Sequence, residues 1–261
     1  MKGFVLLIAA ALVAALPAAA AEGPRRMLEE VEAREYRGVG RLNIAGSRFC
    51  TGALVSERLV LTAAHCLFDP ETRMRTPLSA MRFVAGLRLG AHAASRRVVR
   101  AGILADYVYD GRASLKRIGA DVALIELDAP IRSTGVFRVG GIWRSGAMSI
   151  VSYAKDRAHA PSIQQGCATR AAVGDVAALS CQVTHGASGS PIFVGEGPDR
   201  RVVGVVSAMG KGKKNGQVAL AVMAGPVVAE LEARLTFDDD AARVASTRRQ
   251  APSMRAFATT R

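Results

Sequence analysis

Beyond its first 21 residues the chain lacks a second long, uncharged apolar stretch, because charged residues interrupt every other candidate. A membrane-spanning helix is therefore not expected after the N-terminus, and the processed protein is expected to be soluble. The N-terminus does contain an apolar stretch: Lys2 is followed by uncharged residues from Phe4 to Leu16, then by Pro17 and a run of alanines. This stretch is short for a bilayer crossing, and the small residues suit signal peptidase. Residues 1–21 are predicted to be a secretory signal peptide.

Acidic residues are also scarce, with 22 Asp and Glu against 35 Lys and Arg, so the net charge is +13. Such an excess should attract anionic surfaces. Aromatic residues make up only 5% of the chain and are not interleaved with the basic ones. Specific nucleic-acid binding is therefore not expected. No repeat stands out at solenoid periods, which sets repeat architectures aside.

Cysteines number only four. In an exported protein, periplasmic or extracellular, they are most simply two disulfides. Three pairings are possible, and Cys50–Cys66 with Cys167–Cys181 is the economical choice because each pair brackets one short hydrophobic segment. A zinc site is the alternative, but Cys50, His65 and Cys66 lack a C-x-x-C pattern and a clear fourth ligand. Neither a metal nor another cofactor is expected.

The remaining chain consists of short apolar runs separated by Gly, Pro, Asp and Ser, which indicates an all-β sandwich or barrel. Breakers are dense between residues 130 and 146, so we expect one β subdomain over 38–130 and a second over 131–235. The apolar spacing predicts one closing helix over Pro226 to Leu235. Residues 22–37 are expected to be a pro-segment or flexible arm. Residues 236–261 are expected to be a basic disordered tail, with five arginines and no acid from Ala241 onward.

Three short segments carry residues with chemical potential. In TAAHC, His65 lies beside a cysteine at the end of an apolar strand. It could be a general base that a disulfide holds in place, or a histidine packed in the core. In DVALIEL, Asp121 could hold the second ring nitrogen of that histidine or be a turn aspartate. In GASGSPIF, the backbone N–H groups of Gly186 and Ser188 could form an oxyanion hole, or the segment could be an ordinary turn. The order His, Asp, Ser distinguishes the set.

Two other enzyme classes fit less well. An α/β-hydrolase needs G-x-S-x-G with its acid and histidine after the serine, whereas Ser190 occupies the second position after Ser188 and the other two residues precede it. The stretch GVVSAMGKGKK has five residues between its first two glycines and no Ser or Thr after Lys211. It is therefore interpreted as a basic loop and not as a phosphate loop.

Taken together, TAAHC, DVALIEL and GASGSP resemble the three signature segments of trypsin-like serine proteases, over about Gly38 to Leu235. The resemblance implies two six-stranded antiparallel β-barrels packed across a cleft, with a C-terminal helix. It implies that His65 is the general base, that Asp121 orients it, and that Ser188 attacks the carbonyl of a polypeptide substrate to form an acyl-enzyme. A monomer is expected.

The chain departs from the digestive members of that family at the residue before the nucleophile. Those members have Asp there, which pairs with a newly cut N-terminus, and this chain has Ala187. It also lacks their Ile-Val-Gly-Gly start. An alanine cannot hold an ammonium group, so we predict an oxyanion hole that is formed without this ion pair. The GxSGSP form and the small number of residues between Asp121 and Ser188 are similar to those of the bacterial glutamyl-endopeptidase-like branch.

The residues that would contact substrate follow from counting along the same resemblance. They lie on two walls of the expected pocket: Gln182, Val183 and His185 on one, and Ser207, Ala208 and Met209 on the other. Trypsin's basic preference needs an Asp where Gln182 stands, and the glutamyl branch uses Thr and His where Val183 and Val206 stand. A neutral or apolar substrate side chain is therefore expected. The competing hypothesis is a protease-fold protein with an idle triad that binds anionic surfaces.

Overall fold

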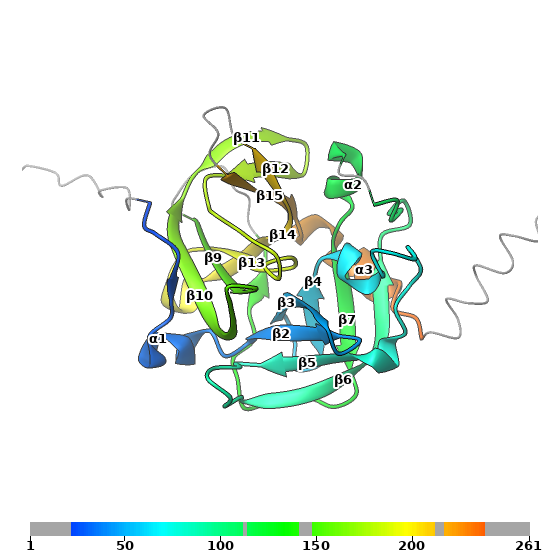
Figure 1. Cartoon of the computed structure of the whole chain (residues 1–261), viewed down its shortest axis with the longest axis horizontal. Helices are drawn as coiled ribbons and strands as arrows, with labels where there is room; N and C mark the ends of the chain where they lie inside the picture. Colours follow the sequence, from blue (N-terminus) through cyan, green and yellow to red (C-terminus); the bar gives the residue numbers. More distant parts are fainter. Residues whose placement is uncertain (1–21, 112–113, 141–147, 212–216, 238–261) are drawn as a thin grey trace, which may run out of the picture.

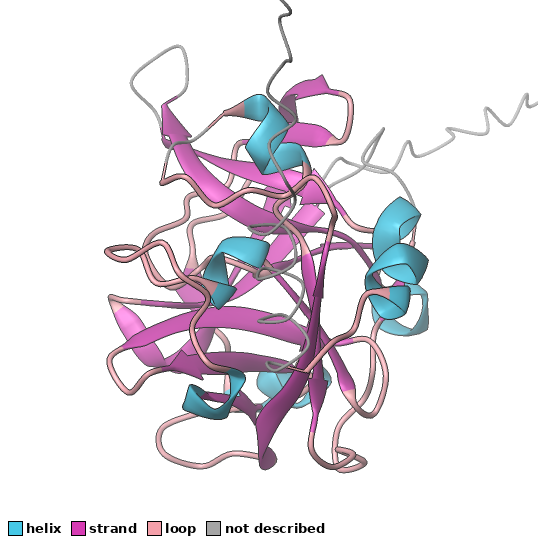
Figure 2. Cartoon of the chain, turned by 90° about the vertical axis from the view of Figure 1, so that its right-hand side faces the viewer, coloured by secondary structure: helices cyan, strands magenta, loops and turns pink. Residues whose placement is uncertain are grey.

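The structure is a computed structural model that describes residues 22–111, 114–140, 148–211 and 217–237. The expected signal peptide and nearly all of the expected tail lie outside these residues. Strands are the main secondary structure of the described chain, and the short helices lie around them (Figures 1 and 2). In Figure 1, the strands of residues 39–54 and 81–103 lie in the lower part of the molecule, and those of residues 169–179 and 217–223 lie at its top.

The first unit is a closed antiparallel barrel with the strand order β2-β3-β4-β7-β6-β5. The strands are β2 (Val39–Ile44), β3 (Arg48–Leu54), β4 (Leu59–Thr62), β5 (Met81–Ala85), β6 (Ala94–Ile103) and β7 (Ala123–Leu127). Phe83 fills the barrel beside Gly40, where a Cβ atom would overlap the phenyl ring. The apolar runs of the sequence therefore form the first barrel as predicted.

The second unit is a curled sheet that, with the closed first barrel, gives the all-β fold of two units that was expected. Its order is β1-β10-β9-β13-β14-β15-β12-β11, and β8 pairs in parallel with β14. The strands are β1 (Arg26–Met27), β8 (Arg138–Val139), β9 (Met148–Ala154), β10 (Arg157–Cys167), β11 (Thr169–Val173), β12 (Val176–Leu179), β13 (Pro191–Val194), β14 (Arg201–Lys211) and β15 (Gln217–Met223). Register shifts in β10, β13 and β14 allow the sheet to bend. Its outermost strands, β1 and β11, do not pair with each other in the part of the chain that is described.

Residues 22–37 are packed on the second sheet, which differs from the flexible arm that was expected. β1 pairs with β10, and the helix α1 (Glu30–Glu35) follows. Leu28 between them is fully buried because it enters the hydrophobic core. Ion pairs Arg25–Asp156 and Arg200–Glu35 hold both ends of the segment. That the segment is a pro-segment stays a prediction.

The C-terminal helix was predicted from its apolar spacing. It consists of a 3₁₀ turn, η4 (Gly225–Val227), and α3 (Val228–Ala233). α3 packs against β6 and β7 of the first barrel, where Leu231 is fully buried beside Gly102. The last segment of the second half of the chain thus covers the first unit. The other helices are α2 (Leu115–Gly119), η1 (Ala64–Leu67), η2 (Leu78–Ala80) and η3 (Gly197–Asp199).

One hydrophobic core runs through the junction of the two units. The ring of Phe193 on β13 contacts Tyr36 from the N-terminal segment and Phe137 from the linker between the units. Both contacts are edge-to-face between buried rings, and they hold the N-terminal segment and the linker against the second sheet. Among the described helices, none has the length and apolar character needed to cross a membrane.

Candidate active site

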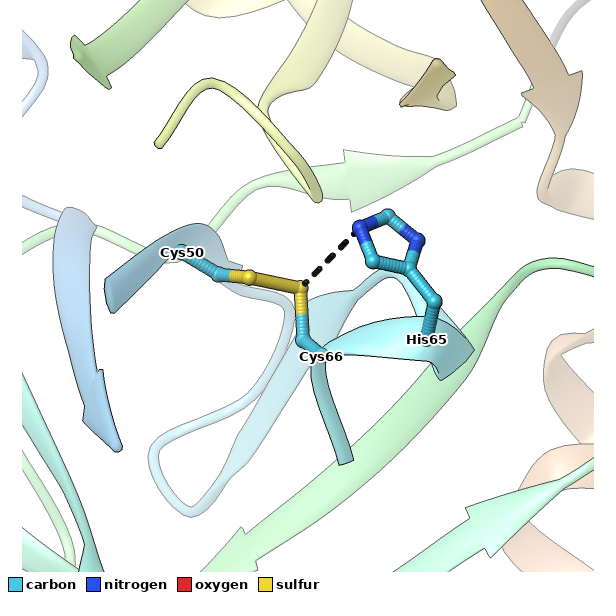
Figure 3. Close-up of side chains that lie close together, drawn as sticks. All are labelled: Cys50, His65 and Cys66. Carbon is cyan, nitrogen blue, oxygen red and sulfur yellow. Dashed lines mark hydrogen bonds between the residues drawn. A yellow bond between two sulfur atoms is a disulfide. The ribbon is translucent and has the colours of Figure 1, made fainter. Parts of the chain in front are cut away.

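His65 lies in η1, directly after strand β4, and its position is fixed by a disulfide. Cys50 on β3 is bonded to Cys66, with 6.3 Å between their Cα atoms, as the economical pairing predicted. Figure 3 shows the imidazole beside this bond, with Nε2 3.9 Å from the Cys66 sulfur. Both sulfurs are used by the disulfide, so these three residues do not form a metal site although their donor atoms lie close together. About a fifth of the imidazole is exposed.

Asp121 precedes β7 and contacts His65 twice. Its Oδ2 lies 2.7 Å from His65 Nδ1, and its Oδ1 accepts a hydrogen bond of 2.8 Å from the His65 backbone N–H. Ser207 on β14 donates its hydroxyl to the same Oδ2 at 2.5 Å. The carboxylate therefore joins a histidine of the first barrel to a strand of the second sheet.

The charge of Asp121 follows from these contacts. The side chain is buried, which alone would raise the pKa of the carboxyl, but the charge of His65 and the hydrogen bonds from His65 and Ser207 lower it overall. The carboxylate stays ionised and can only accept hydrogen bonds, so Nδ1 carries the imidazole proton in their contact. In neutral His65, Nε2 is then the basic nitrogen, free to take a proton.

Ser188 is held on a tight loop before β13. Its carbonyl accepts a hydrogen bond of 2.8 Å from Thr51 N–H on β3, and the next residue, Gly189, donates to Val206 O at 2.7 Å. Gly189 also packs against Thr62 and Ala63, three and two residues before His65, where any side chain would collide. The loop therefore lies next to the start of η1. Ser188 is partly exposed, and its hydroxyl makes no hydrogen bond to another described residue, His65 included.

The loop also presents two unused backbone donors. The His185 carbonyl accepts from Lys155 N–H at 2.7 Å, and the Ala187 carbonyl accepts from Ser190 N–H at 3.0 Å. In a trans peptide the N–H points away from the carbonyl of the same unit, so these bonds direct the N–H groups of Gly186 and Ser188 the opposite way. Neither group donates to any protein atom in the described ranges. Gly186 has a φ of +92° and faces the Phe49 ring, so no other residue fits there.

The geometry agrees with comparisons to known proteins. The family model of trypsin matches residues 28–225. The chain belongs to the trypsin family. Among solved structures, one titled "Structure of Glu endopeptidase in complex with MPD" aligns with a TM-score of 0.66 and 18% identity, over 80% of this chain and 94% of that one. At this identity the match establishes the fold alone, and the predicted fold family is confirmed.

Relative to the trypsin-family fold, the residue before Ser188 departs as predicted from the sequence. Ala187 is buried in a small apolar cluster with Val183 and Ile192. The second disulfide, Cys167–Cys181, adjoins the same cluster and matches the expected pairing. Apolar packing thus takes the place that an acidic residue has in the digestive members.

The expected pocket residues of this trypsin-family chain lie in different environments. Gln182 and His185 are exposed, whereas Val183 is buried against Val206 and Cys181. Ala208 is half-buried, and Met209 is exposed. The Ser207 hydroxyl points to Asp121, a contact that the sequence analysis did not foresee.

Two further residues near the site, Thr51 and Tyr107, gave no sequence signal, and Ser207 gave none for its contact with Asp121. Thr51 and Ser207 are polar residues inside strands, where a hydroxyl has no local pattern. The hydroxyl of Tyr107 is buried near Asp121, and burial and that negative charge raise its pKa far above the ordinary value. A Tyr107 kept neutral in this way adds no second negative charge beside the carboxylate.

Proposed function

We propose that the protein is an exported serine endopeptidase that uses His65, Asp121 and Ser188 as a catalytic triad. The observation that carries the proposal is the double contact between the buried Asp121 carboxylate and His65. This contact fixes the imidazole with its proton on Nδ1, and leaves Nε2 to accept a proton from a nucleophile. Membership of the trypsin family supports peptide-bond hydrolysis as the reaction.

Each step of the reaction then uses a group with a defined position. Ser188 Oγ attacks the carbonyl carbon of the scissile peptide while its proton moves to His65 Nε2. The N–H groups of Gly186 and Ser188 donate to the resulting oxyanion. The imidazolium returns the proton to the leaving amine, and an acyl-enzyme remains on Ser188. A water molecule then attacks the acyl-enzyme while its proton moves to His65 Nε2. The proton returns to Ser188 Oγ as the bond to the acyl group breaks, and the carboxylic acid is released.

We further propose a substrate with a neutral or apolar side chain on the acyl side of the cleaved bond. Gln182, which stands where trypsin has its Asp, offers a neutral amide. The apolar Val183 and Val206 stand where the glutamyl branch has its Thr and His. A preference for Glu is therefore not proposed, although a Glu endopeptidase shares the fold.

Export is proposed from the N-terminal sequence and from the two disulfides, which persist in oxidising compartments. Such a location brings the enzyme to polypeptide substrates outside the cytosol. The net charge of +13 also supports attraction to anionic surfaces. A binding protein with an idle triad is disfavoured by the intact Asp121–His65 contact, because a protein that only binds has no use for an oriented imidazole.

The test is cleavage of a mixed peptide library by the processed chain, with products sequenced by mass spectrometry. Wild type should cleave after neutral or apolar residues. Ser188→Ala should lose at least about 10³-fold in rate. The exposed Ser79→Ala is the matched control and should cleave like wild type. A wild-type protein that cleaves no peptide, or a Ser188→Ala variant that still does, would contradict the proposal.

A further inference from the structure

The loop that carries Ser188 holds its shape without a charged anchor. Ala187 supplies no carboxylate, yet all four consecutive carbonyls from His185 to Ser188 accept hydrogen bonds. Two of these bonds come from Lys155 and Ser190. The other two, to Gly186 O and Ser188 O, come from the single residue Thr51.

Thr51 is fully buried on β3, in the first barrel. Its backbone N–H donates to Ser188 O at 2.8 Å, and its hydroxyl lies 3.0 Å from Gly186 O. The two carbonyls belong to the residues on either side of Ala187. One residue of the barrel therefore holds the backbone both before and after the residue that precedes the nucleophile. The Ala187 N–H, which belongs to the same peptide unit as the Gly186 carbonyl, donates to Thr184 O at 3.0 Å and fixes that unit from its other edge.

The same hydroxyl reaches the second support of the loop. It accepts a hydrogen bond of 2.9 Å from Tyr153 N–H and lies 3.2 Å from Tyr153 O at the end of β9. Two residues later, Lys155 N–H holds the His185 carbonyl and so directs the Gly186 N–H. Thr51 therefore contacts the loop itself and the strand end that orients it. The Thr51 carbonyl accepts in turn from the Thr62 hydroxyl at 2.8 Å, which secures β3 at this point.

We propose that Thr51 is a positioning residue that keeps the N–H groups of Gly186 and Ser188 aimed at one point, in place of an ion pair at Ala187. The inference rests on the proposed function, because it assigns those two groups to an oxyanion. An oxyanion forms only as the reaction proceeds, so loss of the Thr51 hydroxyl should slow turnover more than it weakens substrate binding.

The test compares Thr51→Val, which keeps the shape of the side chain, with Thr51→Ser, which restores the hydroxyl. Thr76→Val is the matched control, since Thr76 is also a buried threonine of the first half but its hydroxyl has no hydrogen-bond partner among the described residues. For a peptide that wild type cleaves, Thr51→Val should lower kcat about 10- to 100-fold and change KM by less than about threefold. Thr51→Ser should recover most of kcat, and Thr76→Val should match wild type. Equal kcat in Thr51→Val and wild type, or an equal loss in Thr76→Val, would overturn the inference.

A second measurement does not depend on activity. Hydrogen exchange of the amides of Ala187, Gly189 and Ser190, which are bonded within the loop, should be faster in Thr51→Val than in Thr76→Val. Unchanged exchange there overturns the role of Thr51, whatever the activity. If wild type cleaves nothing but exchange rises in Thr51→Val alone, the proposed function fails and the positioning of the loop by Thr51 stands. Thr51→Ala gives the same comparison should Thr51→Val not fold.

Discussion

Asp121 is the residue on which the chemistry of the site depends most. It is buried, it accepts hydrogen bonds from the His65 ring, the His65 backbone and Ser207, and these contacts keep its pKa below the ordinary aspartate value. Since the carboxylate stays ionised, it selects the imidazole tautomer that leaves Nε2 unprotonated.

Asp121→Asn tests that role at little cost in shape. The amide NH₂ can face Nδ1, which then becomes the acceptor and leaves the proton on Nε2, where it blocks the removal of a proton from Ser188. We expect kcat to fall by about 10⁴-fold near neutral pH, with KM little changed. Steady-state kinetics on the library-derived peptide measures it, with Asp128→Asn on the barrel surface as the control. A loss below about tenfold would show that Asp121 does not orient the base.

The sequence predicted His65, Asp121 and Ser188 because each stands in a distinctive local frame, and their order along the chain is diagnostic. Thr51 and Ser207 could not be predicted in the same way. Their roles arise from contacts across more than 80 residues of chain, Thr51 with Gly186 and Ser207 with Asp121. A hydroxyl within an apolar strand looks the same whether it faces solvent, a backbone group or a catalytic carboxylate.

Among the elements, the N-terminal segment differs most from its expected role. Its charged, helix-forming residues favoured a flexible arm. In the structure, β1 extends the second sheet, and Gly23 is hydrogen-bonded to Gln164 and Gln165. The other side of the buried Gln164 amide accepts from Gln182 N–H, next to the expected pocket. Strand β10 was not predicted either, because Pro161 and polar residues interrupt its apolar pattern. Its formation depends on pairing with β9 and β1. By contrast, β2 to β7 follow their apolar runs closely.

A substitution at Leu28 tests how much the packing of this segment contributes to the free energy of unfolding. Leu28→Ala should lower the free energy of unfolding by about 2–5 kcal/mol, because a fully buried side chain leaves a cavity in the core. Val31→Ala in α1 is the control, since Val31 is largely exposed and its loss should change stability by less than about 0.5 kcal/mol. Urea unfolding followed by fluorescence gives both values. Equal stabilities of the two variants would mean that residues 22–37 are not packed in solution.

The disulfide beside His65 has a separate contribution. Cys50 and Cys66 are 16 residues apart, so a Cys50→Ser, Cys66→Ser double variant should lose about 3 kcal/mol of unfolding free energy. Activity should fall as well, since η1 loses the bond that holds it to β3. The Cys167–Cys181 disulfide closes a loop of similar length in the second sheet and makes no bond to η1, so the Cys167→Ser, Cys181→Ser variant should lose stability with a smaller fall in kcat. Equal losses of kcat would argue against a role of the first disulfide in placing His65.

At the scale of the whole molecule, the site exists only because the two units meet. His65 and Asp121 belong to the first barrel, and Ser188 and Ser207 to the second sheet. The junction is closed by Thr51 and Ser207 and by α3, which crosses back to the first barrel. The sequence predicted two β units but not the pairing of β1 and β8 with the second sheet, because pairing between distant segments is not encoded in local patterns.

The most direct test of the account is covalent labelling with a fluorophosphonate, which reacts with a serine whose hydroxyl proton is removed by a neighbouring base. Intact-mass and peptide mass spectrometry of the processed protein should show one equivalent of probe, bound at Ser188. Labelling should disappear in Ser188→Ala and nearly disappear in His65→Ala. Absence of the adduct from the folded wild type, or an adduct at Ser188 that forms equally fast without His65, would contradict the claim that these residues act together.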